Sequence, residues 1–277
     1  MGRVIISDST IDGAGFGNAD VGAGTSIAID SNNALHVAYL DSTNSTLKYA
    51  TNASGSWVTE TIESGGISPS IGIDSNGKVH ISHQASNNLR YVNNTSGSWA
   101  FQTIVSGGFG NVSSLAIDSN NSIHIAGSGS SSLHYATNLS GSWVDTVIRS
   151  QTTGGQISIK TDNEPVIGFG GSGGTKLTVA EQVSGTWAFT DIDNVSIDFF
   201  GKAVSDSNGF LHVIYYDTVS GDLKYATDYS GSWMTLTLDS AGDVGNYCDI
   251  AIDANDRLHI SYYDATNGDL KYLTTAD

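Results

Sequence analysis

Aspartate and histidine recur together along the chain at a spacing that invites a metal-binding or catalytic interpretation. Each of five segments has an aspartate in a turn-like stretch and a histidine six residues later. The pairs are Asp30 and His36, Asp74 and His80, Asp118 and His124, Asp206 and His212, and Asp253 and His259. Successive pairs lie 44 or more residues apart, whereas the ligands of a zinc ion must all lie about 2 Å from it. We therefore expect each pair to hydrogen-bond locally and to lock its own turn.

Tyrosine and aspartate gather at a second recurring place, a few residues beyond the histidine. The first segment has Tyr39 and Asp41 there, and the last two segments have complete Tyr-Tyr-Asp runs: Tyr215, Tyr216 and Asp217, then Tyr262, Tyr263 and Asp264. The middle segments read HQA, GSG and FGG instead. Tyrosine rings offer stacking faces, and aspartates accept hydrogen bonds. We predict that these eight residues line a ligand-binding site.

A third position varies four residues before the turn aspartate. It is a serine in the first three segments, whereas the last three carry Gln156, Lys202 and Asp249. We expect Lys202 and Asp249 to form an ion pair or to orient a ligand within a buried polar cluster, since buried charge needs a compensating partner. Both residues belong to the predicted site. The neighbouring stretches add Asp198, Phe199, Phe200, Asp243, Asn246 and Tyr247.

The elements that position these residues follow from the tryptophan spacing. Trp57, Trp99, Trp143, Trp187 and Trp233 lie 42, 44, 44 and 46 residues apart, and each ends the phrase SGSW or SGTW. Each unit contains runs such as SIAID, ALHVAYLD, TLKYAT and WVTETIES, separated by the turn-forming phrases DSNN and NASGS. Short runs rich in β-branched and aromatic residues between such turns predict strands. Four strands in a unit of about 44 residues predict a propeller blade.

The number of repeats predicts how the chain is organised. Six strands of the IAID type are present, and the last unit stops after LKYLTTAD without a fourth strand. The N-terminal RVIISDSTIDG resembles the fourth-strand phrase WVTETIESGG. We predict an all-β, six-bladed β-propeller with four antiparallel strands per blade, in which residues 1–11 complete the last blade and protect its edge. The predicted blades, within a single closed domain, are 26–66, 68–108, 112–153, 156–195, 198–241, and 247–277 together with 1–11.

This pattern resembles the NHL-repeat type of six-bladed propeller. The resemblance lies in SIAIDSNNALHVAYLDSTNSTLKYAT and covers the first three strands of each blade. The SGSW phrase departs from it and is faintly similar to the Asp-box turn of sialidase-like propellers. An Asp box has two residues between glycine and tryptophan, whereas this chain has one. Both resemblances imply a fold rather than a chemistry.

The composition argues against several classes of function. The net charge is −17 with only 11 Lys and Arg residues, so nucleic acids and anionic membranes repel the chain. The single Cys248 excludes an internal disulfide framework and a cysteine-based zinc site. No apolar run approaches the roughly 18 residues of a membrane span, and we expect no membrane insertion. The composition, rich in Ser, Thr, Asn and Gly, favours an extracytoplasmic or secreted protein whose leader is absent from this chain.

Three functions are compatible with these features. We favour a non-catalytic, lectin-like module that binds carbohydrate or another small polar ligand, because the sequence has no Gly-x-Ser-x-Gly elbow, no His-Glu-x-x-His motif and no recognisable cluster of histidine and carboxylate. The first alternative is a hydrolase or lyase acting on a sugar or lactone, with a carboxylate or Ca²⁺ site at the channel mouth, as the six-bladed resemblance implies. The second is a structural or protein-interaction module of a larger secreted or virion-like assembly. We expect no cofactor, with Ca²⁺ as the one candidate ion.

Overall fold

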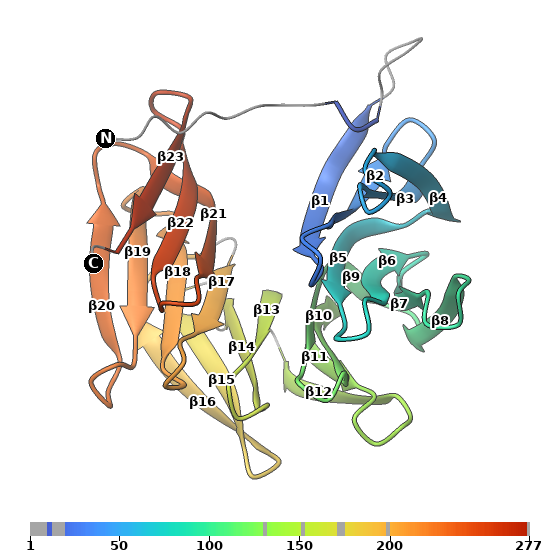
Figure 1. Ribbon diagram of the computed structural model, residues 1–277. Helices are drawn as coiled ribbons and strands as arrows, with labels where there is room; N and C mark the ends of the chain where they lie inside the picture. The colour runs from blue at the N-terminus through green and yellow to red at the C-terminus, as the bar shows by residue number, and fades with distance from the viewer. Residues whose placement is uncertain are drawn as a thin grey trace. The chain divides into compact units, whose positions relative to one another are not determined.

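The computed structural model describes residues 10–12, 20–129, 132–150, 153–170, 175–197 and 200–275. Within these ranges the chain forms 23 strands and no helix (Figure 1). Accordingly, no described helix is long and apolar enough to cross a membrane.

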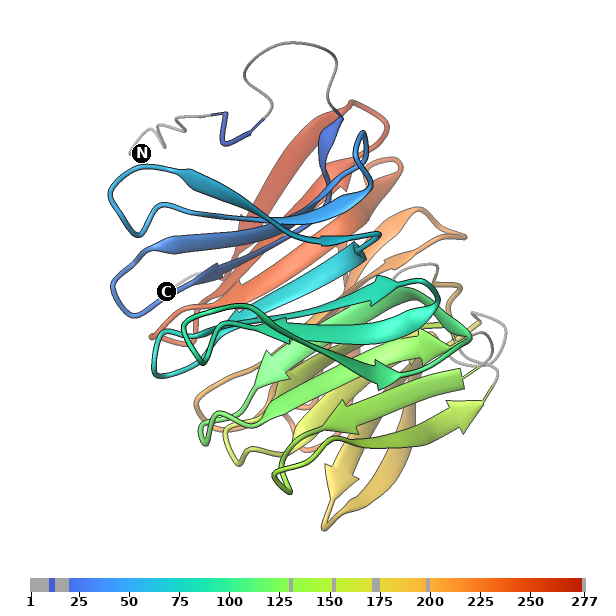
Figure 2. The ribbon, with the colours of Figure 1, turned by 90° about the vertical axis from the view of Figure 1, so that its right-hand side faces the viewer.

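The strands form six antiparallel sheets, in each of which the strands follow one another in chain order (Figures 1 and 2). The first three sheets comprise β1 (Val21–Ile29), β2 (Leu35–Asp41), β3 (Thr46–Thr51) and β4 (Val58–Ser64); β5 (Ile67–Ile73), β6 (Val79–Ala85), β7 (Asn88–Asn93) and β8 (Ala100–Val105); and β9 (Phe109–Ile117), β10 (Ile123–Gly129), β11 (Ser132–Thr137) and β12 (Val144–Ser150). The last three comprise β13 (Thr153–Ile159), β14 (Pro165–Gly170), β15 (Leu177–Val183) and β16 (Thr186–Asp193); β17 (Phe200–Ser205), β18 (Leu211–Asp217), β19 (Asp222–Thr227) and β20 (Met234–Asp239); and β21 (Val244–Ile252), β22 (Leu258–Asp264) and β23 (Asp269–Thr274).

These sheets are the six blades of a β-propeller, so the predicted fold class is confirmed. We number the blades one to six along the chain. Blade six has three described strands. Its predicted closing strand, residues 1–11, falls outside the described residues up to residue 9, and this closure stays a prediction.

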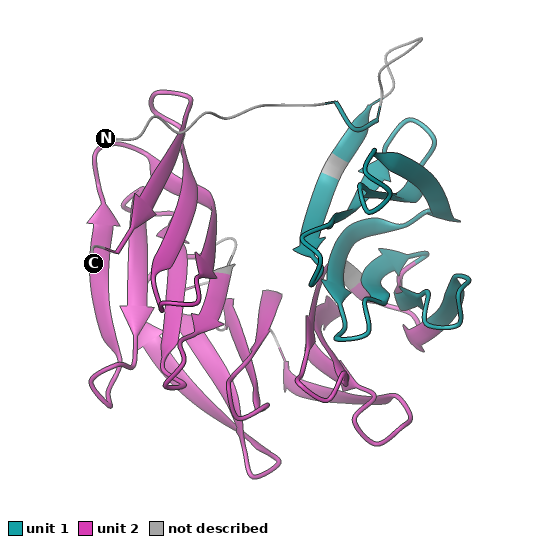
Figure 3. Cartoon of the chain, viewed as in Figure 1, with its two compact units in different colours: residues 1–86, 90–102 teal, residues 87–89, 103–277 magenta. Residues whose placement is uncertain are grey.

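The chain divides into two compact units (Figure 3). Unit 1 comprises residues 1–86 and 90–102, and unit 2 comprises residues 87–89 and 103–277. Unit 1 holds blade one and most of blade two, whereas unit 2 holds blades three to six. The single closed domain predicted from the repeats remains a prediction.

The recurring aspartate builds the turn between the first two strands of a blade. In blade one, Asp30 Oδ1 accepts hydrogen bonds from the backbone N–H groups of Asn32 (2.9 Å) and Ala34 (2.8 Å). The residue three positions after the aspartate, or after Lys160 in blade four, has a positive φ between 60° and 88° in every blade: Asn33, Gly77, Asn121, Asn163, Gly209 and Asp256. Only glycine, asparagine and aspartate adopt this left-handed conformation readily, which explains why these residue types recur there.

Each recurring histidine lies between this aspartate and a tyrosine of the third strand. His36 Nδ1 lies 2.6 Å from the Tyr49 hydroxyl, and its Nε2 lies 3.5 Å from Asp30 Oδ2. The same arrangement occurs in four other blades, with Asp74, His80 and Tyr91; Asp118, His124 and Tyr135; Asp206, His212 and Tyr225; and Asp253, His259 and Tyr272. The hydrogen bond that fixes each histidine is the one to the tyrosine hydroxyl. The expected hydrogen bond to the turn aspartate is present only for His259, whose Nε2 lies 3.5 Å from Asp253 Oδ2; Nε2 of the other four histidines has no hydrogen-bond partner among the described residues, so for those pairs the expectation is wrong.

The asparagine of the NASGS turn ties the third strand to the second. Asn52 Oδ1 accepts the backbone N–H of Leu35 at 2.7 Å, and Asn138 Oδ1 accepts that of Ile123 at the same distance. Both asparagines begin an Asn-x-Ser sequon. Their side-chain oxygens serve the fold, so the turn structure accounts for these residues without a glycan.

Two of the tryptophans, Trp99 and Trp187, pack against the tyrosine of the preceding blade. Trp99 meets Tyr49 edge to face, with ring centroids 5.3 Å apart, and Trp187 meets Tyr135 in the same way at 5.0 Å. This geometry suits the charge distribution of aromatic rings. In these two blades the tyrosine that hydrogen-bonds to the histidine is therefore also a packing surface for the next blade.

Candidate functional site

The first tyrosine of each predicted Tyr/Asp cluster is buried rather than presented to solvent. Tyr39, Tyr215 and Tyr262 are 4%, 0% and 2% exposed. Their hydroxyls donate to the carboxylates of Asp12 (2.7 Å), Asp193 (2.8 Å) and Asp239 (2.7 Å), respectively. Burial and the neighbouring carboxylates raise the pKa of all three phenols. A ligand role for these tyrosines stays a prediction, and their rings offer no open stacking face.

A lysine from the third strand completes each of these clusters. Lys224 Nζ lies 2.6 Å from Asp193 Oδ2, and Lys48 and Lys271 pair in the same way with Asp12 and Asp239. Each ammonium also lies 5.5 to 5.9 Å from the centroid of the blade's own buried tyrosine. In unit 2 the aspartate ends the fourth strand of the preceding blade. We call these groups the Tyr–Asp–Lys clusters, and the two that contain Asp193 and Asp239 connect neighbouring blades of unit 2.

Sequence reasoning missed these aspartates, although they carry a signal. Asp193 and Asp239 each stand six residues after the tryptophan of their unit. Glu63 occupies the same position in the first unit, where it binds His83 Nε2 (2.9 Å) and Arg90 (2.6 Å) in blade two. The repeat shows that an acidic residue recurs at this position. The sequence does not show that its partners lie in the next blade, because that depends on which strands pack together.

Asp41, Asp217 and Asp264 lock the loop between the second and third strands. They are 5%, 8% and 3% exposed. Asp41 accepts bonds from the Asn44 backbone and side chain (3.0 and 2.8 Å), and Asp264 accepts the same pair from Asn267 (3.0 and 2.9 Å). These bonds lower the pKa of both carboxyls. Binding by these aspartates stays a prediction, and the loop structure accounts for them without a ligand.

Lys202 and Asp249 lie together on neighbouring first strands, β17 and β21. Lys202 Nζ is 3.7 Å from Asp249 Oδ1, as the sequence predicted for an ion pair. The expectation that this pair is buried is wrong, because the side chains are 49% and 63% exposed. An exposed pair of this length contributes about 0–1 kcal/mol to stability. Both charged groups are therefore accessible to a ligand.

The serines that precede them in the repeat serve the fold instead. Ser26 Oγ accepts the backbone N–H of Ile71, and Ser114 Oγ accepts that of Ile157, each at 3.1 Å. These bonds join the first strands of successive blades, β1 with β5 in unit 1 and β9 with β13 in unit 2.

The second tyrosines, Tyr216 and Tyr263, lie nearer the surface of unit 2. The Tyr216 hydroxyl donates to Asp243 Oδ1 at 2.5 Å, and Tyr263 is 38% exposed. Tyr263 pairs in register with Asn246, next to Tyr247. Asp198 and Phe199, also named from the sequence, lie outside the described residues.

Tyr247 is the unusual residue of this region. It is 78% exposed and has a φ of 53°. The corresponding residues with positive φ in other blades are Gly24, Ser68 and Gly154. A large side chain in this conformation costs free energy, and such outliers cluster at functional sites. We call Lys202, Tyr216, Asp243, Tyr247, Asp249 and Tyr263 the loop cluster; all are exposed except Tyr216, which is half-buried.

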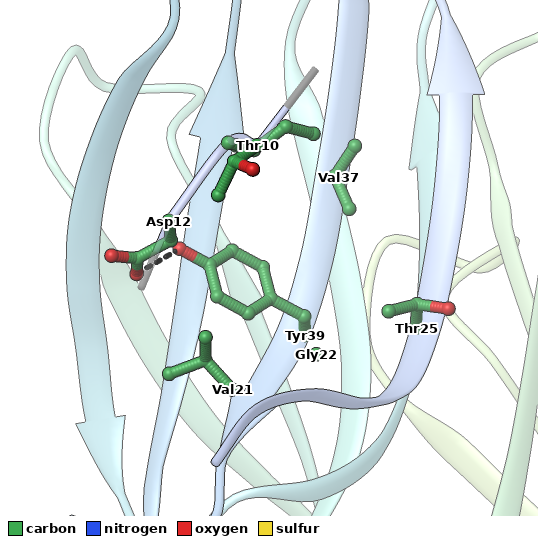
Figure 4. A pocket seen from close by; sticks show the side chains of 8 residues that line it. Thr10, Asp12, Val21, Gly22, Thr25, Val37 and Tyr39 are labelled. Carbon is green, nitrogen blue, oxygen red and sulfur yellow. Dashed lines mark hydrogen bonds between the residues drawn. The ribbon is translucent and has the colours of Figure 1, made fainter. Parts of the chain in front are cut away.

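Blade one, in unit 1, contains a cavity of about 280 Å³ beside Tyr39 (Figure 4). The Tyr39 hydroxyl points toward Asp12 rather than into open space. The remaining lining is mainly small or aliphatic, formed by Thr10, Ile11, Val21, Gly22, Thr25 and Val37. Tyr39 and Asp12 already bond to each other, so the cavity offers weaker recognition chemistry than the loop cluster.

The described residues contain no group of three or more His, Cys, Asp or Glu side chains arranged to hold a metal ion. The expectation about cofactors stays a prediction.

Comparisons with known proteins support the fold. No protein-family model matches the chain, and no curated protein matches it. A protein of unknown function from Dyadobacter fermentans is 14% identical with a TM-score of 0.64, over 93% of this chain and 94% of that one. Virginiamycin B lyase from Staphylococcus aureus is 13% identical with a TM-score of 0.64, over 93% and 85%. The Aleuria aurantia lectin, in complex with Fucα1-6GlcNAc, is 14% identical with a TM-score of 0.57, over 91% and 94%.

At these identities the likeness establishes a shared fold and nothing further. A lyase and a lectin stand side by side among the similar structures. The scaffold therefore does not select between binding and catalysis, and the argument about function rests on the residues of this chain.

Proposed function

We propose that the loop cluster is a non-catalytic binding site that recognises a carbohydrate or another polyhydroxylated ligand. The observation that carries this proposal is Tyr247, a 78% exposed aromatic residue at a position with a φ of 53°. For an L-residue this backbone conformation costs about 1–2 kcal/mol. Three other blades have glycine or serine at this position. A tyrosine that keeps the strained backbone and an exposed ring there is expected where the ring binds a ligand.

The neighbouring groups supply complementary chemistry. The exposed ring of Tyr247 offers a stacking face, while Lys202 donates and Asp249 accepts hydrogen bonds within the same region. Because the pair is solvent-exposed, a sugar hydroxyl can replace water on either group at little cost. The lectin among the similar structures makes a sugar a reasonable first ligand to test. An extracytoplasmic location, inferred from composition, belongs to this proposal.

A glycan array followed by calorimetry on the best ligand tests the proposal. We expect Tyr247→Gly to weaken binding at least about tenfold, which corresponds to 1.4 kcal/mol. The same change should leave the melting temperature unchanged or raise it, because glycine relieves the left-handed strain while increasing the entropy of the unfolded chain by a similar or smaller amount. A Tyr216→Ala/Tyr263→Ala double variant should also weaken binding.

Tyr229→Ala is the matched control, because Tyr229 is 63% exposed and lies in the SGSW turn of blade five, outside the loop cluster. Its removal should leave the affinity unchanged. Absence of glycan binding, or wild-type affinity in Tyr247→Gly, would refute the proposal. A parallel Ca²⁺ titration by thermal shift tests the candidate ion, since saturable binding adds about 2.7 kcal/mol at a hundredfold excess over Kd.

A further inference from the structure

Blade three contains a serine, a histidine and an aspartate in the order of a nucleophilic triad. Ser132 Oγ lies 2.9 Å from His134 Nε2, and His134 Nδ1 lies 3.1 Å from both carboxylate oxygens of Asp145. With the proton on Nδ1, the ring donates to Asp145 and its Nε2 accepts the serine hydroxyl. This arrangement recurs on unrelated folds and is recognised by its geometry rather than by sequence order.

The sheet itself holds the three side chains together. Ser132 and His134 stand two residues apart on β11, so their side chains point to the same face of the sheet. Asp145 lies on β12, where it pairs with Ala136, and His134 pairs with Val147. Asp145 is therefore the diagonal neighbour of His134, within reach across the two strands. The expectation that the chain has no tight cluster of histidine and carboxylate is thus wrong.

The repeat explains why His134 is free for this arrangement. Its position on the third strand holds Lys48, Arg90, Lys224 and Lys271 in four other blades, each paired with an acid that lies six residues after a tryptophan or, for Lys48, with Asp12. For His134 the corresponding position, six residues after Trp99 on the preceding blade, is occupied by Val105. With no acid at that position, the structural ion pair is lost, and His134 instead contacts Ser132 and Asp145 within its own blade.

Gly129 leaves space next to Ser132 because it has no side chain. A Cβ atom added to Gly129 would lie 3.2 Å from Ser132 Oγ and 3.1 Å from His134 Nε2. The ring of Phe109 lies edge-on to His134, with centroids 5.8 Å apart, and provides an apolar wall. The His134 and Asp145 side chains are 13% and 29% exposed, so the group is sheltered but accessible.

We propose that Ser132, His134 and Asp145 hydrolyse small acyl esters, an activity separate from ligand binding at the loop cluster. Ser132 Oγ attacks the ester carbonyl carbon while its proton moves to His134 Nε2. Collapse of the tetrahedral intermediate breaks the bond to the alcohol, which takes that proton from His134. Water then attacks the acyl-serine and gives a proton to His134 Nε2; the bond between the acyl carbon and Ser132 Oγ breaks, Oγ takes that proton back, and the carboxylic acid is released. Asp145 positions the ring and stabilises its protonated form.

The test uses a fluorophosphonate probe with peptide mass spectrometry, together with p-nitrophenyl acetate hydrolysis. We expect the probe to label Ser132 and hydrolysis to saturate. Ser132→Ala should abolish the label on that peptide and lower kcat/KM at least about 100-fold, in the range of general-base contributions. Asp145→Asn should lower kcat at least about tenfold with KM unchanged, because it acts through the histidine.

Two further variants separate catalysis from folding. Ser150→Ala removes an exposed serine directly opposite Ser132 in the strand register and should leave labelling and hydrolysis unchanged. His134→Lys introduces the residue that three other blades carry at this position, so it should fold, yet it should lose the label. Failure of the probe to reach Ser132 in the wild-type protein, equal labelling in His134→Lys, or unchanged hydrolysis in Ser132→Ala would each overturn the proposal.

Discussion

Removal of His124 should destabilise the protein because the Tyr135 hydroxyl then loses its hydrogen-bond partner. His124 is 1% exposed, and its Nδ1 lies 2.7 Å from the hydroxyl of Tyr135, which is 5% exposed. In His124→Ala this hydroxyl has lost its histidine partner inside the sheet, which costs about 1–3 kcal/mol. The rings also stack, with centroids 6.0 Å apart, and the small cavity left by the ring adds about 1 kcal/mol. We expect a loss of about 2–4 kcal/mol.

Asp118 contributes little to this loss. Its Oδ2 lies 3.6 Å from His124 Nε2, whereas its Oδ1 accepts the backbone N–H groups of Asn120 (2.9 Å) and Ser122 (2.7 Å). The turn therefore stays capped when the histidine is removed. The loss should arise from the His124–Tyr135 pair rather than from a disrupted hairpin.

Urea unfolding of a double-mutant cycle measures this directly. Tyr135→Phe alone leaves His124 Nδ1 without its hydroxyl partner and should cost about 1–3 kcal/mol. The cycle uses His124→Leu as its other single variant. His124→Leu/Tyr135→Phe removes both polar partners and should cost less than the sum of His124→Leu and Tyr135→Phe, by at least about 0.5 kcal/mol. Additive losses, or a loss below about 0.5 kcal/mol for His124→Ala, would show that the hydrogen bond is not what stabilises the blade.

Three other perturbations follow from the same contacts. Burial lowers the pKa of His80, His124 and His212 below 6.5; the fold favours their neutral form, so stability measured by denaturation against pH should fall as pH drops below 6.5. A second loss should begin below about pH 4, because Lys271 and Tyr262 hold the pKa of Asp239 at about 2 against 3.8 unfolded; a flat profile from pH 7 to 3 would contradict both. Asp193→Asn removes the charge that pairs with a lysine and accepts a buried tyrosine hydroxyl and should cost about 1–3 kcal/mol, whereas the exposed-pair variant Asp249→Asn should cost less than 1 kcal/mol. Deletion of residues 1–11 should expose the edge of blade six and cause aggregation or a marked fall in melting temperature; a monomeric deletion variant with unchanged melting temperature would disprove the predicted closure.

The sequence predicted the fold because each blade is specified locally. The turn aspartate, the residue with positive φ after it and the asparagine of NASGS all act within about 20 residues, as Asp30, Asn33 and Asn52 do in blade one. Strand alternation and turn chemistry operate on the same short scale. Because one local pattern is repeated six times, the sequence predicts the number of blades and the strands of each blade without knowledge of any long-range contact.

The candidate site was less predictable because its chemistry depends on contacts between blades. Tyr215 and Tyr216 are adjacent in the sequence, but successive side chains of a strand point to opposite faces. Tyr215 accordingly reaches Asp193 in the preceding blade, whereas Tyr216 reaches Asp243 near the surface. The alternation alone indicates that only one of two neighbouring tyrosines can face a ligand; the strand pairing decides which one.

Departures from the repeat fall into two physical classes. In blade three, Gly127 replaces a tyrosine, and the ring of Phe109 occupies the space, since a Cβ at Gly127 would lie 2.3 Å from Phe109 Cζ. That departure is compensated by packing and needs no functional explanation. Tyr247 is different, because it keeps a strained backbone and leaves its ring in solvent. His134 is also different, because it replaces a structural cation with a polar relay to a serine.

An uncompensated departure costs stability without improving the fold. Evolution retains such residues where they serve another purpose. The two positions lie in separate blades, an exposed aromatic ring in blade six and a serine hydroxyl next to a histidine in blade three. The proposed binding and the proposed hydrolysis should therefore be lost independently, and a variant that removes one while sparing the other would be the strongest evidence that the two sites are distinct.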